Sequence, residues 1–397
     1  MIKHVFTLVW NRRRTNVLIV TEVLISFLVV CAVLTLGTHY LTNYMKPLGF
    51  DYEDVWSIEV STGLPWSRLG QSSAMNTTRQ LLETARSYPE VTAAAGILVT
   101  PFGGSTWRDN VDNINTAVMY DGATDDLLQL LGLRLLQGRW FDRTDDAQNW
   151  NPAVINASLR DRLFGNEDPL GKTLIKVSEH RKKEVRVVGV IDDFRLKGEL
   201  RAPFDLYLSR LRLDDTLSFH QPDLLVRVQP GTPLEFEERL MTGLAAAAPG
   251  WSFNIQPLSK MRKAQFTEML APLGIAALIA GFLLLMVGFG LLGVLWQNVT
   301  RRTAEIGLRR ALGAHARSVY LQILAEILVV ATIGLAVGTL IVIQFPLLGI
   351  DEDISLLTYV IGLLLSIGAI YFLAAVCGLY PSWLASRIGP AAALHYE

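Results

Sequence analysis

Cysteine and histidine are scarce in this sequence. Its 397 residues include two cysteines, Cys31 and Cys377, and both lie inside apolar runs, so neither a disulfide framework nor a Cys-x-x-Cys metal site is available. The six histidines show no spacing typical of metal ligands, which argues against a metal enzyme. The formal net charge is −1, so no global field favours nucleic acid as a partner.

Apolar residues, by contrast, are abundant. They make up 51% of the chain and raise the mean hydropathy to +0.32, while 18% of the residues are charged. This composition is too apolar for an ordinary soluble protein and too charged for a pure membrane bundle. We therefore expect one part of the chain in a membrane and another in water.

Four apolar stretches are long enough to cross a bilayer core of about 30 Å as helices. They are residues 17–37, 272–296, 319–345 and 356–380. Lysines and arginines precede the first stretch, separate the second from the third and follow the fourth, whereas the loop GIDEDIS between the last two is acidic. Because loops rich in Lys and Arg stay in the cytoplasm, we expect both termini and the arginine-rich loop inside.

The first stretch is interpreted as an uncleaved anchor. It is long for the apolar region of a signal peptide, and no A-x-A cleavage pattern follows it. The string LVVC before Cys31 resembles a lipoprotein signal, but Val30 is bulky where a small residue is needed. The segment after the anchor is therefore expected outside the cytoplasm.

That outer segment, residues 42–268, is long enough to bury its own core. VWSIEVS and VTAAAGILVT have strand character, and MNTTRQLLETARSYPE between them has helical periodicity. Further on, DLLVRVQ, PLEFEERLMTGLAAAAPG and WSFNIQPL have the character of strand, helix and strand. Between these two α/β pieces lie turn residues and short β-like runs such as PAVIN and EVRVVGVI.

The predicted fold class is an α-helical membrane protein with four transmembrane helices plus a large α/β extracytoplasmic domain that is split around an inserted β-rich lobe. The predicted order is a cytoplasmic N-terminus with the first span (1–41), the first half of the split part (42–118), the lobe (119–220), the second half (221–268), the second span (269–298), a cytoplasmic helix (299–316), the third span (317–345), a short outer loop (346–355), the fourth span (356–380) and a cytoplasmic C-terminus (381–397).

Two strings resemble nucleotide-binding motifs but are interpreted otherwise. GNEDPLGKT, residues 165–173, has one residue too many before GK, and its acids would repel phosphate, so we predict a turn between a helix and a strand. GFGLLG, residues 288–293, lies inside an apolar stretch. We predict close helix packing at Gly288, Gly290 and Gly293 and at the GxxxG pair Gly334 and Gly338.

Two carboxylates lie inside apolar stretches, Glu22 in the first and Glu326 in the third. Counted from the flanking arginines at 1.5 Å per residue, both are expected about 12–14 Å inward and thus at similar depth. An intramembrane carboxylate is costly and usually faces protein or water. A proton or ion relay and a hydrogen-bonded contact between helices are both compatible with the pattern. No group of residues elsewhere suggests catalysis.

The arginine-rich loop VTRRTAEIGLRRALGAHA, residues 299–316, has the pattern of a helix. Glu305 lies four residues from both Arg301 and Arg309, a spacing that supports a short exposed helix. Ile306 and Leu308 supply apolar surface, and Gly313 suits the position that ends a helix. One face can pack on the neighbouring spans while the other meets a cytosolic partner.

Several strings resemble motifs of the MacB/FtsX-like permeases of ABC transporters, the type VII or mechanotransmission class. They are RTAEIGLRRALGA after the second span, GLYPSWLASRIGPAAALHYE at the C-terminal end, and LLGLRLLQGRWF, AVINASLRDRLFGNEDPLGKTL and VVGVIDDFR in the outer domain. The likeness covers nearly the whole chain, and several motifs together make it specific.

The resemblance implies a permease of the bacterial inner membrane whose porter-like part is split by the β-rich lobe. It implies a pairing with a second copy or a similar permease, and a cytosolic ATPase that binds ATP and Mg²⁺, whereas this chain binds no cofactor. Without a fused ATPase domain, the ATPase is expected to be a separate chain, and a periplasmic adaptor is a further candidate partner. The implied ATPase-coupling residues are Arg301, Arg302, Glu305, Ile306, Gly307, Leu308, Arg309, Arg310, Leu312 and Gly313.

Three functions compete at this point. The leading one is a non-catalytic permease that uses ATP-driven movement to export a peptide, antibiotic, siderophore or lipoprotein. The second is transmembrane signalling, in which the outer domain senses a ligand or activates an extracytoplasmic hydrolase. The third, a membrane-anchored enzyme, lacks any supporting group of residues.

Overall fold

A computed structural model of the protein describes residues 13–63, 71–111, 118–176, 183–213, 221–301, 315–349 and 354–386. The chain divides into two compact units. One is Asn43–Glu268, and the other combines Met1–Thr42 with Met269–Glu397. Both divisions fall within long helices, the first near the end of α2 and the second inside α7.

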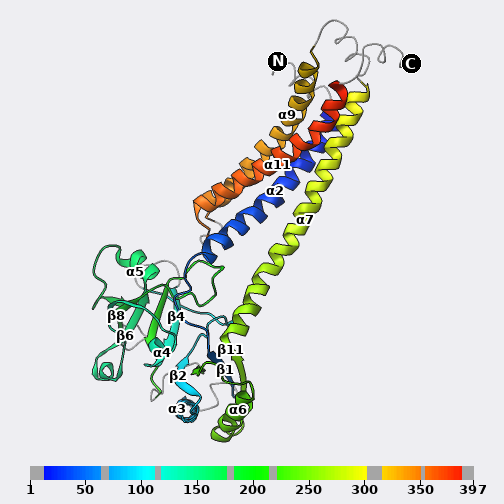
Figure 1. The fold of residues 1–397 in the computed structure, drawn as a ribbon. Coiled ribbons are helices and arrows are strands. Elements are labelled where there is room, and N and C mark those ends of the chain that lie inside the picture. The colour runs from blue at the N-terminus through cyan, green and yellow to red at the C-terminus, as the bar shows by residue number, and fades with distance from the viewer. Residues whose placement is uncertain are drawn as a thin grey trace. The chain divides into compact units, whose positions relative to one another are not determined.

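The second of these units is helical. It contains α2 (Arg13–Tyr44), most of α7 (Leu258–Arg301), α9 (Ala316–Val342), α10 (Gln344–Leu347) and α11 (Leu356–Ser386) (Figure 1). By length and composition, four stretches can cross a membrane: Val17–Tyr44, Leu258–Gln297, Leu324–Leu347 and Leu356–Leu379. The four membrane helices predicted from the sequence are confirmed.

The structure extends three of these helices, α2, α7 and α11, beyond the predicted apolar runs, and α7 shows the largest extension. The second was expected to begin near Pro272, yet α7 begins at Leu258 and continues through that proline. A proline inside a helix removes one backbone hydrogen bond, which a long helix packed on its neighbours tolerates. Hydropathy identifies only the apolar part of a helix, which is the part suited to lipid. The polar first turns of α7 are identified as helical only by the backbone structure.

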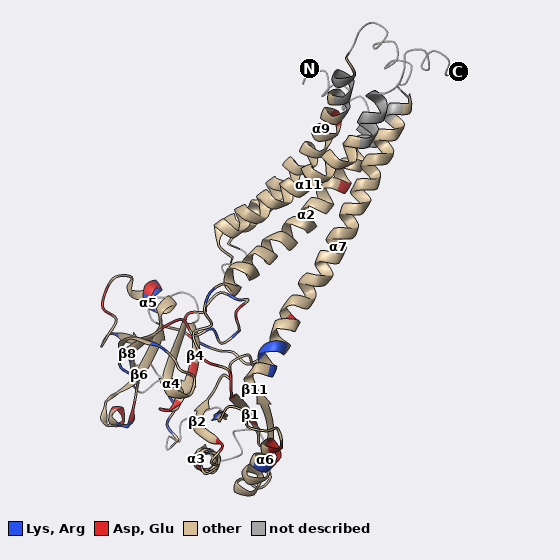
Figure 2. Ribbon diagram, in the orientation of Figure 1, with Lys and Arg blue, Asp and Glu red and all other residues tan. Residues whose placement is uncertain are grey.

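The helices share one apolar core. It is formed by Ile19, Val23, Phe27 and Cys31 of α2, Val287, Leu291 and Leu295 of α7, Ile327, Val330, Ala331 and Leu335 of α9, and Ile370, Ala374 and Cys377 of α11. Both cysteines are buried as free thiols. Charged residues are nearly absent along these helices (Figure 2): after the basic first turns of α7, the helix is uncharged from Met269 to Thr300.

The unit Asn43–Glu268 is built on a mixed sheet. Its strands are β1 (Val55–Ser61), β2 (Val91–Ile97), β3 (Trp107–Asp109), β4 (Val118–Ala123), β5 (Leu135–Gly138), β6 (Trp150–Asn156), β7 (Thr173–Ile175), β8 (Glu184–Ile191), β9 (Leu206–Arg210), β10 (Asp223–Val228) and β11 (Ser252–Pro257). Their order is β11-β1-β10-β2-β4-β9-β6-β8-β5, with β3 on β4 and β7 on β8. The strands predicted at VWSIEVS, VTAAAGI, PAVIN, EVRVVGVI, DLLVRV and SFNIQP are confirmed.

The shorter helices are α3 (Gln71–Arg86), α4 (Leu127–Leu130), α5 (Ala157–Phe164) and α6 (Glu235–Ala247), together with the 3₁₀ helix η2 (Arg143–Ala147). Helices α3 and α6 pack side by side on one face of β11, β1, β10 and β2 (Figure 1). Strand β1 fits this arrangement because Trp56, Ile58 and Val60 alternate toward the two helices. GNEDPLGKT follows α5 and precedes β7, so the predicted helix-to-strand turn is confirmed.

The two predicted halves of the split part interleave in this sheet, because β1 and β2 come from the first half while β10 and β11 come from the second. The strands of 119–220 continue the same sheet through a single residue pair, Ile97 with Ala123. Residues 43–268 are therefore one compact unit, and the division at 118/119 stays a prediction.

Candidate functional site

Most of the predicted ATPase-coupling residues lie outside the described residues. They are Arg302, Glu305, Ile306, Gly307, Leu308, Arg309, Arg310, Leu312 and Gly313. Arg301 is the last residue of α7. Their role stays a prediction.

The glycines Gly334 and Gly338 lie on α9 against α2. A Cβ built on Gly334 would lie 3.0 Å from Cγ1 of Val23 and 3.1 Å from the carbonyl oxygen of Val20, and one on Gly338 would collide with the Phe27 ring. The contacts advance along both helices together, so α2 and α9 run in the same direction. Without side chains at these two positions, the helices approach closely.

Gly288 lies on α7 against α11, where a Cβ would lie 3.6 Å from Sγ of Cys377. Such a distance is ordinary contact, so a side chain here would need little rearrangement. The closer approach in GFGLLG is at Gly290, whereas a Cβ on Gly293 would meet nothing within 4 Å.

Glu22 of α2 lies against Gly290 of α7. A Cβ on Gly290 would lie 2.6 Å from Oε2 of Glu22, so the glycine leaves the space that the carboxyl group fills. One turn further along α2, Ser26 is fully buried, and its hydroxyl has no hydrogen-bond partner in the described part of the chain. Glu22 therefore packs between helices, next to a second polar group.

Glu326 is not level with Glu22, which corrects the expected similar depth. Gly334 faces Val20 and Val23, and Glu326 lies eight residues before Gly334 on a parallel helix. At 1.5 Å per residue, this places Glu326 about 12 Å nearer the start of the helices than Glu22. The expectation assumed that flanking arginines mark equal levels, but close packing at glycines sets the relative position of these helices.

A second group of polar contacts lies in the unit Asn43–Glu268 and centres on residues 192–201, which follow β8 and are called here the junction segment. Its sequence is DDFRLKGELR, in which apolar Phe194, Leu196 and Leu200 are buried in the core and alternate with charged residues. Four of its six charged residues, Asp193, Arg195, Lys197 and Glu199, each bond to a different part of the unit.

Arg195 binds the end of α2. It is 2% exposed, and its Nη1 donates hydrogen bonds to the carbonyl oxygens of Asn43 at 2.8 Å and Lys46 at 3.1 Å. Its Nη2 donates to the carbonyl oxygens of Glu199, at 2.6 Å, and Arg201. The last carbonyl groups of a helix have no partner within the helix, and the guanidinium supplies one. Burial lowers the pKa of Arg195.

Glu199 binds the beginning of α7. Its Oε1 accepts hydrogen bonds from Nε of Arg262, at 2.8 Å, and from Nη2 of the same side chain. Nη1 of Arg262 also donates to the Tyr52 hydroxyl at 3.1 Å, and the guanidinium lies over the Tyr52 ring. The Glu199 side chain is 8% exposed and the Arg262 side chain 33%, so the carboxylate of this ion pair is desolvated while the guanidinium is partly solvated.

The other two of these four residues anchor the junction segment itself. Asp193 accepts hydrogen bonds from the backbone N–H and the hydroxyl of Ser158, both at 2.9 Å, in the first turn of α5. Lys197 donates to the carbonyl oxygens of Gly103, at 2.8 Å, and Ser105, and burial lowers the pKa of its ammonium group. The segment is thus tied to the rest of the unit on both sides of Arg195.

Gly198 is required where the segment passes α7. Its φ of +79° lies in the left-handed region, and a Cβ would lie 2.8 Å from Oε1 of Gln265. The junction segment thus contacts both chain connections of the unit: the last turn of α2 through Arg195 and the first turns of α7 through Glu199 and Gly198. Sequence reasoning missed this site because Asn43, Arg195 and Arg262 are far apart in the chain. The alternation of charged and apolar residues in a segment without strand structure was the available signal.

Comparison with known proteins identifies two family models. Residues 17–240 match the MacB-like periplasmic core domain, and residues 277–390 match the FtsX-like permease C-terminal domain. Relatives include two proteins named macrolide export ATP-binding/permease protein MacB. The one from Bdellovibrio bacteriovorus is 29% identical over 72% of this chain and 44% of its own length. The one from Neisseria meningitidis is 25% identical over 81% of this chain and 49% of its own.

Among solved structures, the periplasmic region of MacB from Actinobacillus actinomycetemcomitans aligns with 56% of this chain and 96% of its own, at 20% identity and a TM-score of 0.37. The chain spans about half the length of the relatives it matches. Because the first family model covers more than half of the chain and the second covers three of its four membrane helices, this chain belongs to the MacB/FtsX-like permeases of ABC transporters, membrane proteins with a periplasmic domain.

Proposed function

We propose that this chain transmits ATP-driven movement from a cytosolic ATPase to its periplasmic domain, and that the domain uses the movement to drive export on the outer side of the membrane. The observation that supports the proposal most directly is the junction segment. Transmission requires an element whose state depends on both ends of the machine. One buried segment that bonds to the last turn of α2 and to the first turns of α7 suits that role, because displacement of either helix end would strain it.

The proposed ATPase partner is a separate cytosolic subunit that binds ATP and Mg²⁺ and docks on residues 299–316, with this chain non-catalytic. We propose an inner-membrane location with both termini and residues 299–316 in the cytoplasm, and a pairing with a second permease copy or a similar permease. A periplasmic adaptor is a further proposed partner. The relatives are named for both ATP binding and permease function, which supports an ATPase in the same system.

The proposed cargo is a molecule handled outside the cytoplasm, such as a peptide, antibiotic, siderophore or lipoprotein. The relatives are named for macrolide export. The domain Asn43–Glu268 is the part of the chain proposed to engage it.

The docking proposal is tested with an ABC ATPase that co-purifies with the parent chain. The charge reversal Glu305→Lys and the polar substitution Leu308→Asp are each expected to abolish co-purification of the ATPase and stimulation of its ATP turnover by the permease. The matched substitution Glu167→Lys, at an exposed position of the periplasmic domain, should change neither. If both coupling variants still bound and stimulated the ATPase, docking at residues 299–316 would be refuted.

Transmission is tested by removing one contact of the junction segment. In the double variant Glu199→Gln and Arg262→Gln, the ion pair to α7 is lost while the side-chain shapes are retained. Nitroxide labels at position 166 in the domain and position 281 in α7 would report an ATP-dependent distance change in the parent complex. The double variant should still bind the ATPase but lose that change, whereas Lys172→Gln, which removes an exposed ion pair, should retain it. An unchanged ATP response in the double variant would argue against transmission through this segment.

A further inference from the structure

A polar cavity of about 450 Å³ lies within the unit Asn43–Glu268. Its walls come from α3, from the residues after β4, from η2 and from the end of β9. Helix α3 belongs to the predicted first half of the split part and the other walls to the predicted lobe, so an occupant would contact both. The volume suits a small molecule of about the size of a tripeptide.

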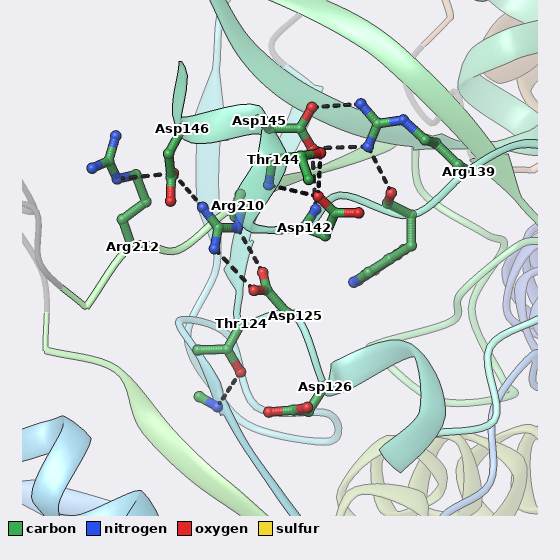
Figure 3. A network of polar contacts seen from close by, with 12 residues as sticks. Thr124, Asp125, Asp126, Arg139, Asp142, Thr144, Asp145, Asp146, Arg210 and Arg212 are labelled. Carbon is green, nitrogen blue, oxygen red and sulfur yellow. Dashed lines mark hydrogen bonds and ion pairs between the residues drawn. The ribbon is translucent and has the colours of Figure 1, made fainter. Parts of the chain in front are cut away.

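The floor of this cavity is a rigid ion-pair network. Arg210 has a side chain only 8% exposed and binds Asp125 with two hydrogen bonds, Nε to Oδ1 at 2.6 Å and Nη2 to Oδ2 at 2.9 Å. Its Nη1 binds Asp146, whose Oδ1 also lies 3.3 Å from Nε of Arg212 (Figure 3). These charges largely satisfy one another, so the floor holds its shape without needing a ligand.

Three charged residues of the wall are in a different situation. Arg79 has one hydrogen bond, to the Asn76 amide at 3.4 Å, and Arg143 has no hydrogen-bond or ion-pair partner within the described residues. Glu83, one turn after Arg79 on α3, likewise has no side-chain partner there. The wall therefore presents to the same space two guanidinium groups and one carboxylate that have no ion-pair partner within the described residues.

Neighbouring residues fix the backbone position of Arg143. It begins η2, whose preceding residue Asp142 accepts a hydrogen bond from Thr144 N at 2.7 Å, while Asp145 returns the bond by accepting from Asp142 N at 3.1 Å. Asp145 is in turn held by Arg139 (Figure 3). This capping box fixes the short helix from which Arg143 extends, and Arg79 and Glu83 extend from a regular helix. Because these side chains extend from fixed backbone positions, binding orders the side chains but not the backbone.

From these charges we infer that the cavity binds a short peptide with free termini, whose carboxylate pairs with Arg79 and Arg143 and whose ammonium pairs with Glu83. Guanidinium groups bind planar carboxylates with paired hydrogen bonds. A multiply charged anion such as phosphate is disfavoured because Glu83, Asp125 and Asp126 also line the space. This inference names a cargo class and rests on the proposed export function.

The experiment is a calorimetric titration of the purified full-length chain in detergent, without ATPase or ATP, with trialanine as the probe. We expect saturable binding, weakened at least tenfold by amidation of the C-terminus and likewise by acetylation of the N-terminus. Arg143→Ala and Arg79→Ala should abolish the effect of amidation, and Glu83→Gln the effect of acetylation. The matched variant Arg134→Ala, an exposed arginine away from the cavity, should bind as the parent does.

Two results would overturn the inference. One is no binding of trialanine at millimolar concentration by a chain whose thermal unfolding is intact. The other is tighter binding of inorganic phosphate than of trialanine, which would make the cavity an anion site. Because no ATPase takes part, either result leaves the transmission experiment unaffected, and failure of transmission leaves the titration interpretable.

Discussion

The guanidinium of Arg195 lies 2.8 Å from the main-chain oxygen of Asn43, a residue 152 positions earlier in the chain. The contact is buried on both sides, since Asn43 is 3% exposed and Arg195 2%. A positive charge at the carbonyl end of a helix also interacts favourably with the helix dipole. One side chain thus completes the hydrogen bonding of the helix end and ties it to the junction segment.

Substitution of Arg195 is expected to destabilise the periplasmic domain strongly. Arg195→Ala removes the guanidinium donor from four carbonyl groups, of which Asn43 keeps the bond from Lys46 N, and each buried carbonyl left without a donor costs about 1–3 kcal/mol. Arg195→Lys keeps the charge but not the planar fork, so it should fall between the parent and the alanine variant. Thermal unfolding of the purified chain, followed by tryptophan fluorescence, measures the stability of the parent and of the two variants. Equal stability of all three proteins would contradict the capping role.

Gly338 is expected to tolerate no large side chain. Gly338→Leu would force apart α9 and the buried Phe27 of α2, and overpacking of this kind costs about 1–3 kcal/mol. Gly281→Leu is the matched control, because a Cβ there meets nothing within 4 Å. The measurement is the temperature at which the detergent-purified chain loses its helical circular dichroism. Adding Phe27→Ala to the Gly338→Leu variant should restore part of the lost thermal stability. If the stability were not restored, the destabilising clash would not involve Phe27.

Asp223 is expected to make the stability of the periplasmic domain depend on pH. Burial raises its pKa from 3.8 to about 6, while its carboxylate accepts hydrogen bonds from Val60 N at 3.2 Å and the Thr100 hydroxyl at 2.9 Å, and the negative charge of Glu59 adds to the rise. The folded state therefore binds more protons than the unfolded state between about pH 4 and 6. This contribution to stability is greatest below pH 4 and is lost as the pH rises through 6, by roughly 3 kcal/mol.

Asp223→Asn removes the titrating group but keeps its shape. The difference in unfolding temperature between variant and parent should therefore shift in favour of the variant as the pH is raised from 5 to 8. The exposed Asp161→Asn provides the comparison, and its difference from the parent should stay constant. A constant difference for Asp223→Asn as well would mean that its carboxyl titrates near its ordinary pKa.

The proposed topology predicts that a cysteine in place of the exposed Asn166 reacts with a membrane-impermeant maleimide added to cells with a permeabilised outer membrane. Both native cysteines are buried, so Asn166→Cys supplies a single accessible thiol. Labelling is read as a mass shift of the purified chain. Protection from the impermeant reagent together with reaction of a permeant one would reverse the orientation.

Secondary structure was largely predictable where the sequence has a regular hydrophobic pattern. VWSIEVS alternates and forms β1, and the four apolar stretches form long helices. The helix bounds were less predictable, because α7 begins among polar residues and continues through Pro272. Packing between helices was predictable in kind, at glycines, but not in register, so Glu22 and Glu326 were expected level and are offset.

The polar sites were not predictable for a different reason. Arg195 meets Asn43, and Glu199 meets Arg262, only after the sheet has brought the junction segment to the ends of two helices. Nothing in the local sequence of any of these residues specifies a partner. The cavity wall is similar, since Arg79 and Arg143 lie on elements that are separated by several strands in the chain.

Strands β2 and β4 pair over a short length, and side-chain hydrogen bonds there supplement the main-chain bonds from Leu98 N to the Gly122 oxygen and from Thr124 N to the Gly96 oxygen. Only Ile97 and Ala123 pair in the strand register, while Asp121 accepts from the backbone N–H of Leu98 and Val99, and Thr124 accepts from Gly96 N at 2.9 Å. Substitution of Asp121 or Thr124 would remove hydrogen bonds that join these two strands. Single substitutions at these positions can therefore change the stiffness of the connection between the two sets of strands.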